Sequence, residues 1–411
     1  MEPLVTGDRV DCTYGGTQLN GTYITERDGK AVIKLDSGYN IGVGMETCRF
    51  LERPVPVSRP EILTVQDPAL PSLSIISTGG TIASRIDYRT GAVTSQFDAD
   101  DILRAIPGLS GIARYRTTQL YTILSENMTP RIWQELATAV YKEIKSGAEG
   151  VIVTHGTDTM SFSSAAVSFM VDTPVPVIFV GSQRSADRPS SDNTMNALCS
   201  ATAAVSPFGE VAVIMHASTS DDRCAIHRAT RVRKMHTSRR DAFQSIGISP
   251  LGFVEYPSLN VDLSPEAVRR GSDEPAIRPA LDESCRLLYF YPGMPPSALP
   301  QPGEVHGLVI AGTGLGHVST DWIPTLKTLT DQGTVVMMTS QCLNGRVCDR
   351  VYDTGRDLLK IGVIEGADTL PEVALVKMMW VLGNENSPDK QRILLSTSLK
   401  GECMKRSHHG L

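Results

Sequence analysis

The sequence predicts an α/β protein with mainly parallel sheets, preceded by a small all-β domain. Three observations lead to this fold class. Short strand-like runs separated by tight turns fill residues 7 to about 52, a proline-rich stretch follows, and apolar strands alternate with amphipathic helices from residue 73 onward. Strands that alternate with helices are typical of parallel sheets covered by helices. A length of 411 residues leaves room for roughly two or three such units.

Composition excludes several classes of protein. The net charge of −6 provides no general basic field for holding nucleic acid. No run of about 18 apolar residues predicts a membrane span, and the first residues lack the apolar core of a signal peptide. The eight cysteines form no CxxC pair, which indicates neither a zinc ribbon nor a disulfide framework, and no other metal site is expected. We therefore expect a cytoplasmic protein.

Residues 1–55 are predicted to form a small, SH3-like β-barrel. Asp28-Gly29 separates the β-rich runs at 22–25 and 31–35, and Asp-Gly between such runs is a strong hairpin signal. Four or five short strands in so few residues favour a curled barrel. The prolines between positions 54 and 71 then indicate an extended linker over residues 56–72, because proline interrupts both helices and central strands.

A larger α/β domain is predicted over residues 73–290. Apolar runs at 73–77, 151–154 and 175–180 predict strands. Between the first two lies a clearly marked helix, with Thr129 as the expected N-cap, Pro130 at its first position and Gly147 after its end. Apolar side chains at 132, 133, 136, 140 and 144 follow the helical period and predict its buried face.

A smaller α/β domain is predicted over residues 303–385. It follows a second proline-rich break at 292–302 and contains strands at 307–311 and 334–339 and a helix around 372–382. Residues 386–411 are weakly patterned, and we expect a C-terminal tail there.

Two motifs lie directly after predicted strands, where open α/β sheets build their sites. Residues 77–84 read Ser-Thr-Gly-Gly-Thr-Ile-Ala-Ser, and residues 154–160 read Thr-His-Gly-Thr-Asp-Thr-Met. Paired glycines allow backbone N–H groups to face a ligand. For the first motif, an ordinary strand-to-loop turn is about as good an explanation as a ligand-binding loop. For the second motif, the alternative explanation is helix N-capping by Thr157, Asp158 or Thr159. His155 is more typical of a packed histidine than of a catalyst.

Residues 227–240 contain six cationic side chains, and three explanations are open. A solvated surface is the most ordinary. A patch for phosphate or RNA backbone is a second. The third is that one member is buried and reactive, and Lys234 is the candidate because a desolvated lysine, unlike an arginine, can lose its proton.

Together these segments resemble the L-asparaginase/glutaminase family. The matching motifs are TGGTIAS at 78–84, THGTDTM at 154–160, the loop at 180–192 and Thr-Leu-Pro-Glu at 369–372, and the resemblance covers about residues 73–385. It implies an asparaginase-like two-domain fold. The N-terminal extension, with Lys-Leu-Asp-Ser-Gly-Tyr-Asn-Ile-Gly at 34–42, and the arginine-rich run resemble the asparaginase-like subunits of archaeal glutamyl-tRNA(Gln) amidotransferases.

The resemblance implies roles for the catalytic residues. Thr81, the second threonine of TGGT, would be the nucleophile. Thr157, Asp158 and Lys234 would form the second catalytic group, with Lys234 as base. Either this group or Tyr88 would activate Thr81, and the sequence leaves both alternatives open.

It also implies a substrate site. The residues expected to bind substrate are Tyr88, Ser125, Glu126, Gly80 and Gly156. Tyr88 would lie in a mobile lid, Ser125 with Glu126 would hold the amino acid, and a glycine turn would supply N–H groups to the oxyanion. Leu315 stands where relatives usually have an asparagine that reaches the neighbouring chain's substrate.

The implied activity is glutamine hydrolysis that supplies ammonia for converting Glu-tRNA(Gln) to Gln-tRNA(Gln). The chain itself would need no cofactor, and a synthetase-like partner, the other subunit of such a complex, would use ATP and Mg²⁺. A homodimer within a heterotetramer is expected, with tRNA(Gln) bound through the complex and no membrane contact. Two alternatives are a stand-alone L-asparaginase and an RNA- or partner-binding module on an inactive asparaginase fold.

Overall fold

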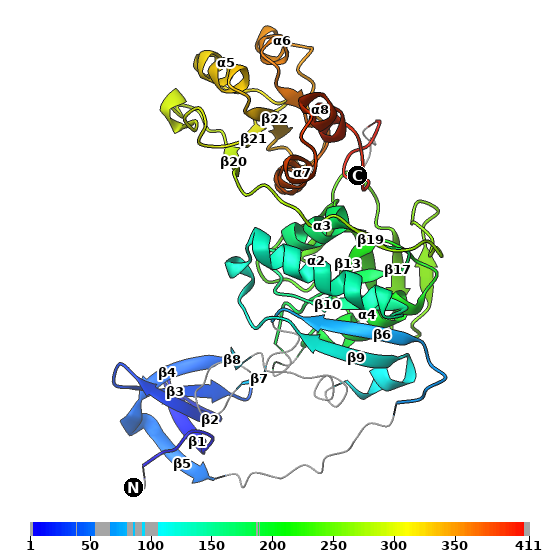
Figure 1. The fold of residues 1–411 in the computed structure, drawn as a ribbon. Helices are drawn as coiled ribbons and strands as arrows, with labels where there is room; N and C mark the ends of the chain where they lie inside the picture. The colour runs from blue at the N-terminus through cyan, green and yellow to red at the C-terminus, as the bar shows by residue number, and fades with distance from the viewer. Residues whose placement is uncertain are drawn as a thin grey trace.

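The computed structural model describes residues 3–37, 39–53, 66–79, 106–185, 188 and 190–406, and the backbone of 85–86 and 93–94. Figure 1 shows an N-terminal β domain, a central α/β unit and a C-terminal α/β unit that follow one another along the chain. The predicted α/β class with a small all-β domain in front is confirmed.

The N-terminal domain is a five-stranded antiparallel sheet in the order β4-β3-β2-β1-β5. The β-bulges in the β1–β5 and β2–β3 pairs bend the sheet, and its core includes Val10, Tyr23 and Ile33. Residues 54–65, most of the predicted linker, lie outside the described residues. The elements are β1 (Arg9–Tyr14), β2 (Thr17–Arg27), β3 (Lys30–Leu35), β4 (Asn40–Gly44), η1 (Met45–Thr47) and β5 (Cys48–Glu52).

The central unit contains an eight-stranded sheet, counted over the described residues, in the order β18-β17-β14-β13-β12-β10-β6-β9. Strands β9, β6, β10, β12 and β13 run parallel, and β14, β17 and β18 extend the sheet by antiparallel pairing. The bounds are β6 (Ser72–Ser77), β9 (Arg114–Gln119), β10 (Gly150–Thr154), β12 (Val177–Val180), β13 (Val211–His216), β14 (Arg223–Arg228), β17 (Gly252–Glu255) and β18 (Val261–Leu263).

Short elements complete this unit. Three two-stranded pairs lie outside the main sheet in the described chain. They are β7 (Arg85–Ile86) with β8 (Val93–Thr94), β11 (Val171–Asp172) with β19 (Ala276–Ile277), and β15 (Val232–Lys234) with β16 (Phe243–Ser245). The short 3-10 helices are η3 (Pro107–Gly111) and η4 (Ser125–Asn127).

Helices cover both faces of the central sheet. Helices α2 (Pro130–Lys145) and α3 (Met160–Met170) pack on one face, and α4 (Asn193–Val205) packs on the other. The predicted helix signals are confirmed in α2, because the Thr129 side chain accepts a hydrogen bond from the Ile132 N–H at 3.3 Å and Pro130 is the first helical residue. Trp133, like Leu136, Val140 and Ile144, is buried, whereas Ile132 is only half-buried.

The C-terminal unit is a parallel sheet in the order β20-β21-β22-β23. Because β20 starts at Cys285, the second sheet begins well before the predicted boundary at 303. Helices α5 and α6 cover one face, and α7 covers the other. The bounds are β20 (Cys285–Tyr289), η5 (Pro296–Ala298), β21 (Gly307–Gly312), η6 (Thr320–Trp322), α5 (Ile323–Asp331), β22 (Val335–Ser340), α6 (Asp353–Lys360), β23 (Ile364–Glu365), α7 (Pro371–Asn384) and α8 (Pro388–Ser396).

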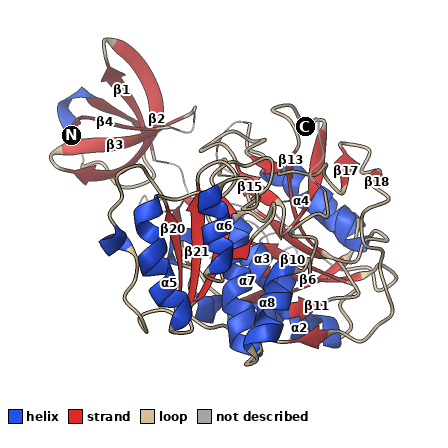
Figure 2. Ribbon diagram, turned by 90° about the horizontal axis from the view of Figure 1, so that it is seen from above, coloured by secondary structure: helices blue, strands red, loops and turns tan. Residues whose placement is uncertain are grey.

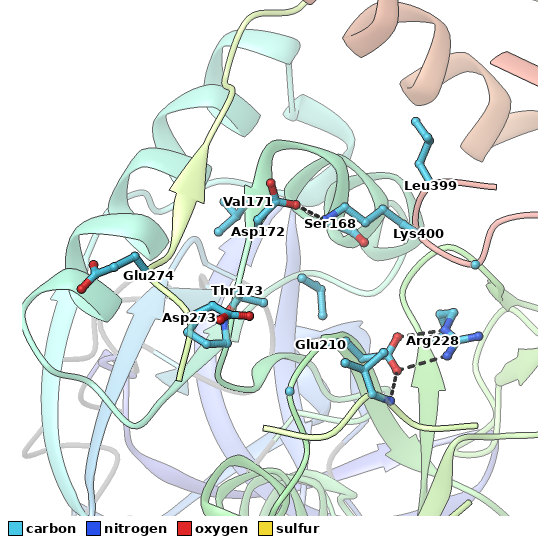
Figure 3. A pocket seen from close by; sticks show the side chains of 15 residues that line it. Ser168, Val171, Asp172, Thr173, Glu210, Arg228, Asp273, Glu274, Leu399 and Lys400 are labelled. Carbon is cyan, nitrogen blue, oxygen red and sulfur yellow. Dashed lines mark hydrogen bonds and ion pairs between the residues drawn. The ribbon is translucent and has the colours of Figure 1, made fainter. Parts of the chain in front are cut away.

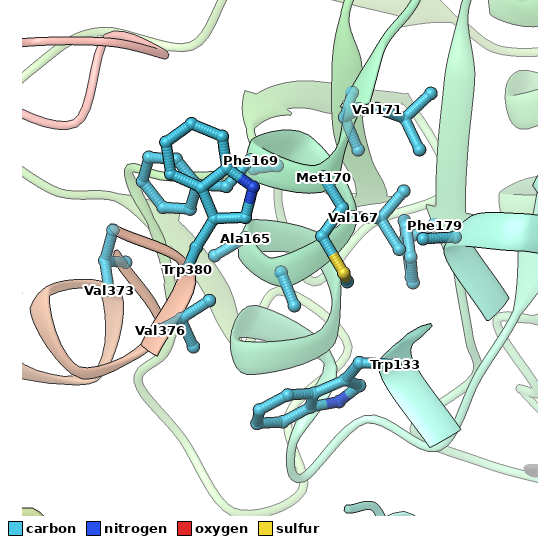
Figure 4. Close-up of a cluster of buried hydrophobic side chains, with 14 of the residues drawn as sticks. Trp133, Ala165, Val167, Phe169, Met170, Val171, Phe179, Val373, Val376 and Trp380 are labelled. Carbon is cyan, nitrogen blue, oxygen red and sulfur yellow. The ribbon is translucent and has the colours of Figure 1, made fainter. Parts of the chain in front are cut away.

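The two α/β units share one hydrophobic core. Helix α7 lies between α3 and the second sheet (Figure 1), and α3 and α7 overlap when the molecule is seen from above (Figure 2). Figure 4 shows the contact, in which Trp380 and Val376 of α7 face Phe169 and Ala165 of α3. The Phe169 and Trp380 rings stack with their centroids 6.1 Å apart. Removing either ring would open a cavity between the units, at a cost of about 3–5 kcal/mol.

The C-terminal segment is structured, contrary to the expected tail. It begins with α8, and residues 397–406 run back over both α/β units. Lys377 of α7 pairs with Glu402 at 2.7 Å, and both side chains are fully buried. Loss of either partner would leave an unpaired charge in the interior, which is strongly destabilising.

Asp349 gives a pH-dependent contribution to the stability of the C-terminal unit. It is fully buried, and neither carboxyl oxygen has a hydrogen-bond partner among the described residues. Burial, aided by the nearby Glu365, raises its pKa to about 7. The folded state therefore favours the protonated acid, and its stability falls as the pH rises from the unfolded-state pKa through about 7, after which this contribution levels off.

We expect Asp349→Asn to raise the thermal midpoint at pH 8 relative to the wild type and to change it much less at pH 5, because the substitution removes the ionisation that opposes folding. Thermal unfolding followed by circular dichroism at both pH values measures this. Asp357→Asn, at a partly exposed carboxylate paired with Lys360, is the control. An equal shift at both pH values would contradict the assignment.

Candidate active site

Strands β6 and β10 bring the first two motifs together. They are neighbouring parallel strands with Ser77 opposite Thr154, so the loops that follow them leave the same edge of the sheet. Thr78 is buried, and its backbone N–H and its hydroxyl both donate to the Thr154 carbonyl, at 3.1 and 3.0 Å. The segment that leads into Thr81 is therefore fixed to the start of the 155–159 loop.

Two glycines allow a third segment, residues 121–127, to approach this edge. Gly79 has a φ of +109°, and a Cβ there would lie 2.5 Å from the Ile123 carbonyl oxygen. A Cβ on Gly156 would lie 2.7 Å from the Ser125 Cβ. Only glycine fits such close backbone contacts. The predicted residues Gly156 and Ser125 are therefore in direct contact.

Lys234 joins the same edge from β15. Its Nζ donates to the Thr157 hydroxyl at 2.9 Å and to the Asp158 carboxylate at 2.6 Å. The Lys234 side chain is 13% exposed, whereas that of Asp158 is 69% exposed. Three predicted catalytic residues that are up to 77 positions apart in the sequence thus form one cluster that solvent reaches from the Asp158 side.

Helix capping does not account for Thr157 and Asp158. Helix α3 starts at Met160 with Thr159 as its N-cap residue, and no side chain makes a capping hydrogen bond there. The Thr159 hydroxyl instead donates to the Ser125 carbonyl at 2.6 Å. The polar side chains of this loop are thus directed to Ser125 and Lys234.

His155 is a structural residue in this edge. It is fully buried, its Nδ1 donates to the Gly156 carbonyl at 2.7 Å, and burial lowers its pKa to about 4. The imidazole is therefore neutral near pH 7, and its hydrogen bond fixes the backbone just before Thr157.

The loop after β12 is organised by one buried carboxylate. Asp192 accepts hydrogen bonds from the Ser182 hydroxyl and from the N–H groups of Gln183 and Arg184, at 2.8–2.9 Å. Its Oδ2 also accepts from Asn196 at 2.9 Å. The sequence resemblance includes this loop, but the role of Asp192 depends on contacts that residue type alone does not reveal.

Each of the six cations in the 228–240 run has a carboxylate partner. The pairs are Arg228–Glu210, Arg231–Asp368, Arg233–Glu372, Lys234–Asp158, Arg239–Asp241 and Arg240–Asp221. Arg231 is fully buried. The first half of the run is therefore paired and largely buried within the fold, whereas residues 235–239 are exposed and form a solvated face in which Arg239 pairs with Asp241.

Four further residues were predicted for the site, and the structure describes one of them. Gly80, Thr81 and Tyr88 lie outside the described residues. Glu126 is exposed in η4, next to the buried Ser125. Within the described chain, no group of three or more His, Cys, Asp and Glu side chains is arranged to hold a metal ion, and no helix has the length and apolarity needed to span a membrane.

A pocket of about 410 Å³ lies apart from this cluster, between the central unit and the C-terminal segment (Figure 3). Two of its cations are paired with carboxylates of the same pocket, Arg228 with Glu210 and Lys400 with Asp172. None of the predicted site residues that the structure describes lines it.

Comparisons with known proteins match each part of the chain. Residues 72–267 match the family described as Asparaginase, N-terminal, residues 285–395 the Glutaminase/Asparaginase C-terminal domain, and residues 4–50 the GatD N-terminal domain. The chain is 52% identical to the D-type subunit of glutamyl-tRNA(Gln) amidotransferase from Methanosarcina mazei, over 96% of this chain and 97% of that one. The chain belongs to this GatD family.

Other members and solved structures agree with this. Identity to the GatD relative of Archaeoglobus fulgidus is also 52%, over 98% of this chain and 96% of the relative. The L-asparaginase of Thermococcus kodakarensis is 30% identical with a TM-score of 0.72, and L-asparaginase I of Vibrio cholerae is 27% identical with a TM-score of 0.70. Each comparison spans 82% of this chain and 100% of the asparaginase chain. This GatD chain thus carries an asparaginase fold.

Because Gly156 packs against Ser125, the stability of the fold should depend strongly on the size of the side chain at position 156. We expect Gly156→Ala to destabilise this GatD chain by about 1–3 kcal/mol, because the added methyl group overlaps Ser125. Chemical denaturation with urea measures the change. Gly111→Ala is the control, since a Cβ at Gly111 meets nothing within 4 Å. Equal effects at both positions would contradict the close packing.

Proposed function

We propose that this chain is the glutaminase component of a glutamyl-tRNA(Gln) amidotransferase and that Thr81 is its nucleophile. The observation that carries the site assignment is the cluster of Lys234, Thr157 and Asp158 at the sheet edge from which the Thr81 segment leaves. Membership of the GatD family, with an asparaginase fold, supports an amidohydrolase that works within an amidotransferase.

The proposed reaction is acyl transfer from the glutamine carboxamide. The Thr81 hydroxyl attacks the side-chain carbonyl carbon, and backbone N–H groups of the glycine turns stabilise the oxyanion. The amide nitrogen takes up the proton that Thr81 released, the carbon–nitrogen bond breaks, and the nitrogen leaves as ammonia. Water then cleaves the acyl-enzyme and releases glutamate, which regenerates the Thr81 hydroxyl.

Lys234 is proposed to receive the threonine proton through Thr157. This transfer requires Lys234 as the neutral amine, because an ammonium group has no lone pair to accept a proton. A hydroxyl both donates and accepts, so the Thr157 hydroxyl, 2.9 Å from Nζ, can donate to the neutral amine while it accepts from Thr81. Asp158 holds Nζ by a second hydrogen bond, which orients the amine. Activation by Tyr88 is the other route, and substitution of Lys234 distinguishes the two.

The other steps of the tRNA-dependent reaction are proposed to take place on a partner subunit. The chain works as a homodimer with a synthetase-like partner subunit, which binds tRNA(Gln) and uses ATP and Mg²⁺. No step drawn for this chain uses a cofactor. Co-purification from the native host and glutaminase assays with and without Glu-tRNA and ATP test this arrangement, and rapid asparagine hydrolysis by the isolated chain would favour a stand-alone asparaginase.

Thr81→Val should abolish glutamine hydrolysis while leaving the chain folded, because the isosteric side chain lacks the nucleophilic oxygen. Ammonia release and thermal unfolding are measured on the same preparation. Thr138→Val, at a helix hydroxyl that binds the Gln134 carbonyl, should keep full activity. An active Thr81→Val enzyme would refute the nucleophile.

Lys234→Met should lower kcat for glutamine by about 10²–10⁴, with a smaller effect on KM, because it removes the proton acceptor and leaves the substrate contacts. Lys327→Met, at an exposed lysine paired with Asp331, is the matched control. A Lys234→Met enzyme with near-normal kcat would instead favour activation by Tyr88.

A further inference from the structure

The strand that carries Lys234 is short and stands apart from the main sheet. Strand β15 has three residues and pairs with the three-residue β16, and this pair is separate from the eight-stranded sheet. An isolated two-stranded hairpin is marginally stable by itself. The position of Lys234 therefore depends on what packs against the two faces of β15.

The two faces of β15 contact different α/β units. Side chains alternate along a strand, so Val232 and Lys234 share one face and Arg233 points to the other. Val232 is buried in the core that includes α3, and Lys234 binds the loop before α3. On the opposite face, the Arg233 Nε lies 3.5 Å from Glu372 Oε1 of the C-terminal unit.

Glu372 is placed for this contact by the fold. It is the second residue of α7 and is 5% exposed. A buried carboxylate requires a partner, and in the described part of the chain its cation is Arg233. Helix α7 also packs on α3 through Trp380 and Phe169. One helix thus supports both β15 and the helix that follows the Thr157–Asp158 loop.

The residue before the strand is held from the same side. Arg231 donates to the Asp368 carbonyl at 2.7 Å and to its carboxylate at 2.6 Å, and this pair is almost completely buried. Asp368 also accepts from the Met404 N–H at 2.9 Å, and the Thr230 hydroxyl donates to the Lys400 carbonyl at 2.8 Å. The C-terminal unit and segment therefore fix the approach to β15.

We propose that Glu372, acting through Arg233, is a positioning residue that holds β15 where Lys234 reaches both Thr157 and Asp158. This inference rests on the proposed function, because it assigns Lys234 a role in the reaction. Glu372 itself touches none of the proposed reacting groups that the structure describes. Arg233 contacts Glu372 and also donates a hydrogen bond to Tyr289, and in this proposal the Glu372 contact on one face of the strand helps to place the amine on the other.

The test is Glu372→Gln in the full-length chain within its complex, assayed for glutamine hydrolysis. We expect kcat to fall by about 10- to 100-fold with KM nearly unchanged, because a small misplacement of a proton-transfer group costs rate and spares binding. Arg233→Lys, which keeps the charge, should retain more activity than Arg233→Gln. Arg239→Gln removes a cation of the same run that pairs with Asp241 and should leave kcat unchanged.

Adding Glu372→Gln to the Lys234→Met variant distinguishes a positioning role of Glu372 from a purely structural role. If Glu372 acts through Lys234, Glu372→Gln should lower the residual rate of Lys234→Met by less than about twofold. An unchanged kcat in Glu372→Gln, an undiminished effect in the Lys234→Met background, or a loss that only follows the unfolded fraction would each overturn the inference. If Glu372→Gln does not fold, Arg233→Lys and Arg233→Gln carry the same comparison. A fully active Lys234→Met enzyme would overturn this inference and favour activation of Thr81 by Tyr88, whereas an active Thr81→Val enzyme would refute the proposed function of the site.

Discussion

The packing of α7 against α3 is the contact on which the arrangement of this protein depends. Helix α3 starts just after the loop that carries Thr157 and Asp158, and α7 carries Glu372, which pairs with Arg233, in its first turn. The stacked rings of Phe169 and Trp380 join the two helices. Because this apolar contact is continuous with the cores of both sheets, the polar residues of the candidate site are placed by a rigid, close-packed interior.

The arginine-rich run shows why charge patterns in a sequence are hard to interpret. From the sequence, a solvated face, an anion-binding patch and a buried reactive lysine are all compatible with six cations in residues 228–240. The structure shows that all six are paired with carboxylates, some of which the local sequence does not reveal, because partners such as Asp368 lie 137 positions away in the chain. A buried ion pair such as Arg231–Asp368 is expensive to desolvate, and removing one partner would leave an uncompensated charge in the interior.

The sequence predicted those parts of the fold and site that local signals determine. Helix α2 was predictable because Thr129, Pro130 and the apolar period act within a few residues, and the motif loops because parallel strands end at a common edge. The contacts of Gly79 and Gly156 with residues 121–127 were not predictable, because they join segments that are far apart in the chain. The C-terminal segment was missed for a similar reason: α8 is short, and the contacts that hold the segment on the fold, such as Lys400 with Thr230 and Met404 with Asp368, join residues 170 and 36 positions apart.

Lys234 binds residues of the central unit, whereas the strand that carries it also contacts the C-terminal unit through Arg233. Its two hydrogen bonds, of 2.9 and 2.6 Å, tolerate little displacement. The Arg233–Glu372 pair links β15 to α7, so the proposed positioning role connects these two hydrogen bonds to the place of α7, and a small misplacement of a proton-transfer group costs rate. Thr157 and Asp158 belong to the loop fixed by His155 and Thr159. The rate of the proposed reaction is therefore sensitive to the relative position of the two units, whereas the proposed substrate contacts at Ser125 and Gly156 lie in the central unit alone.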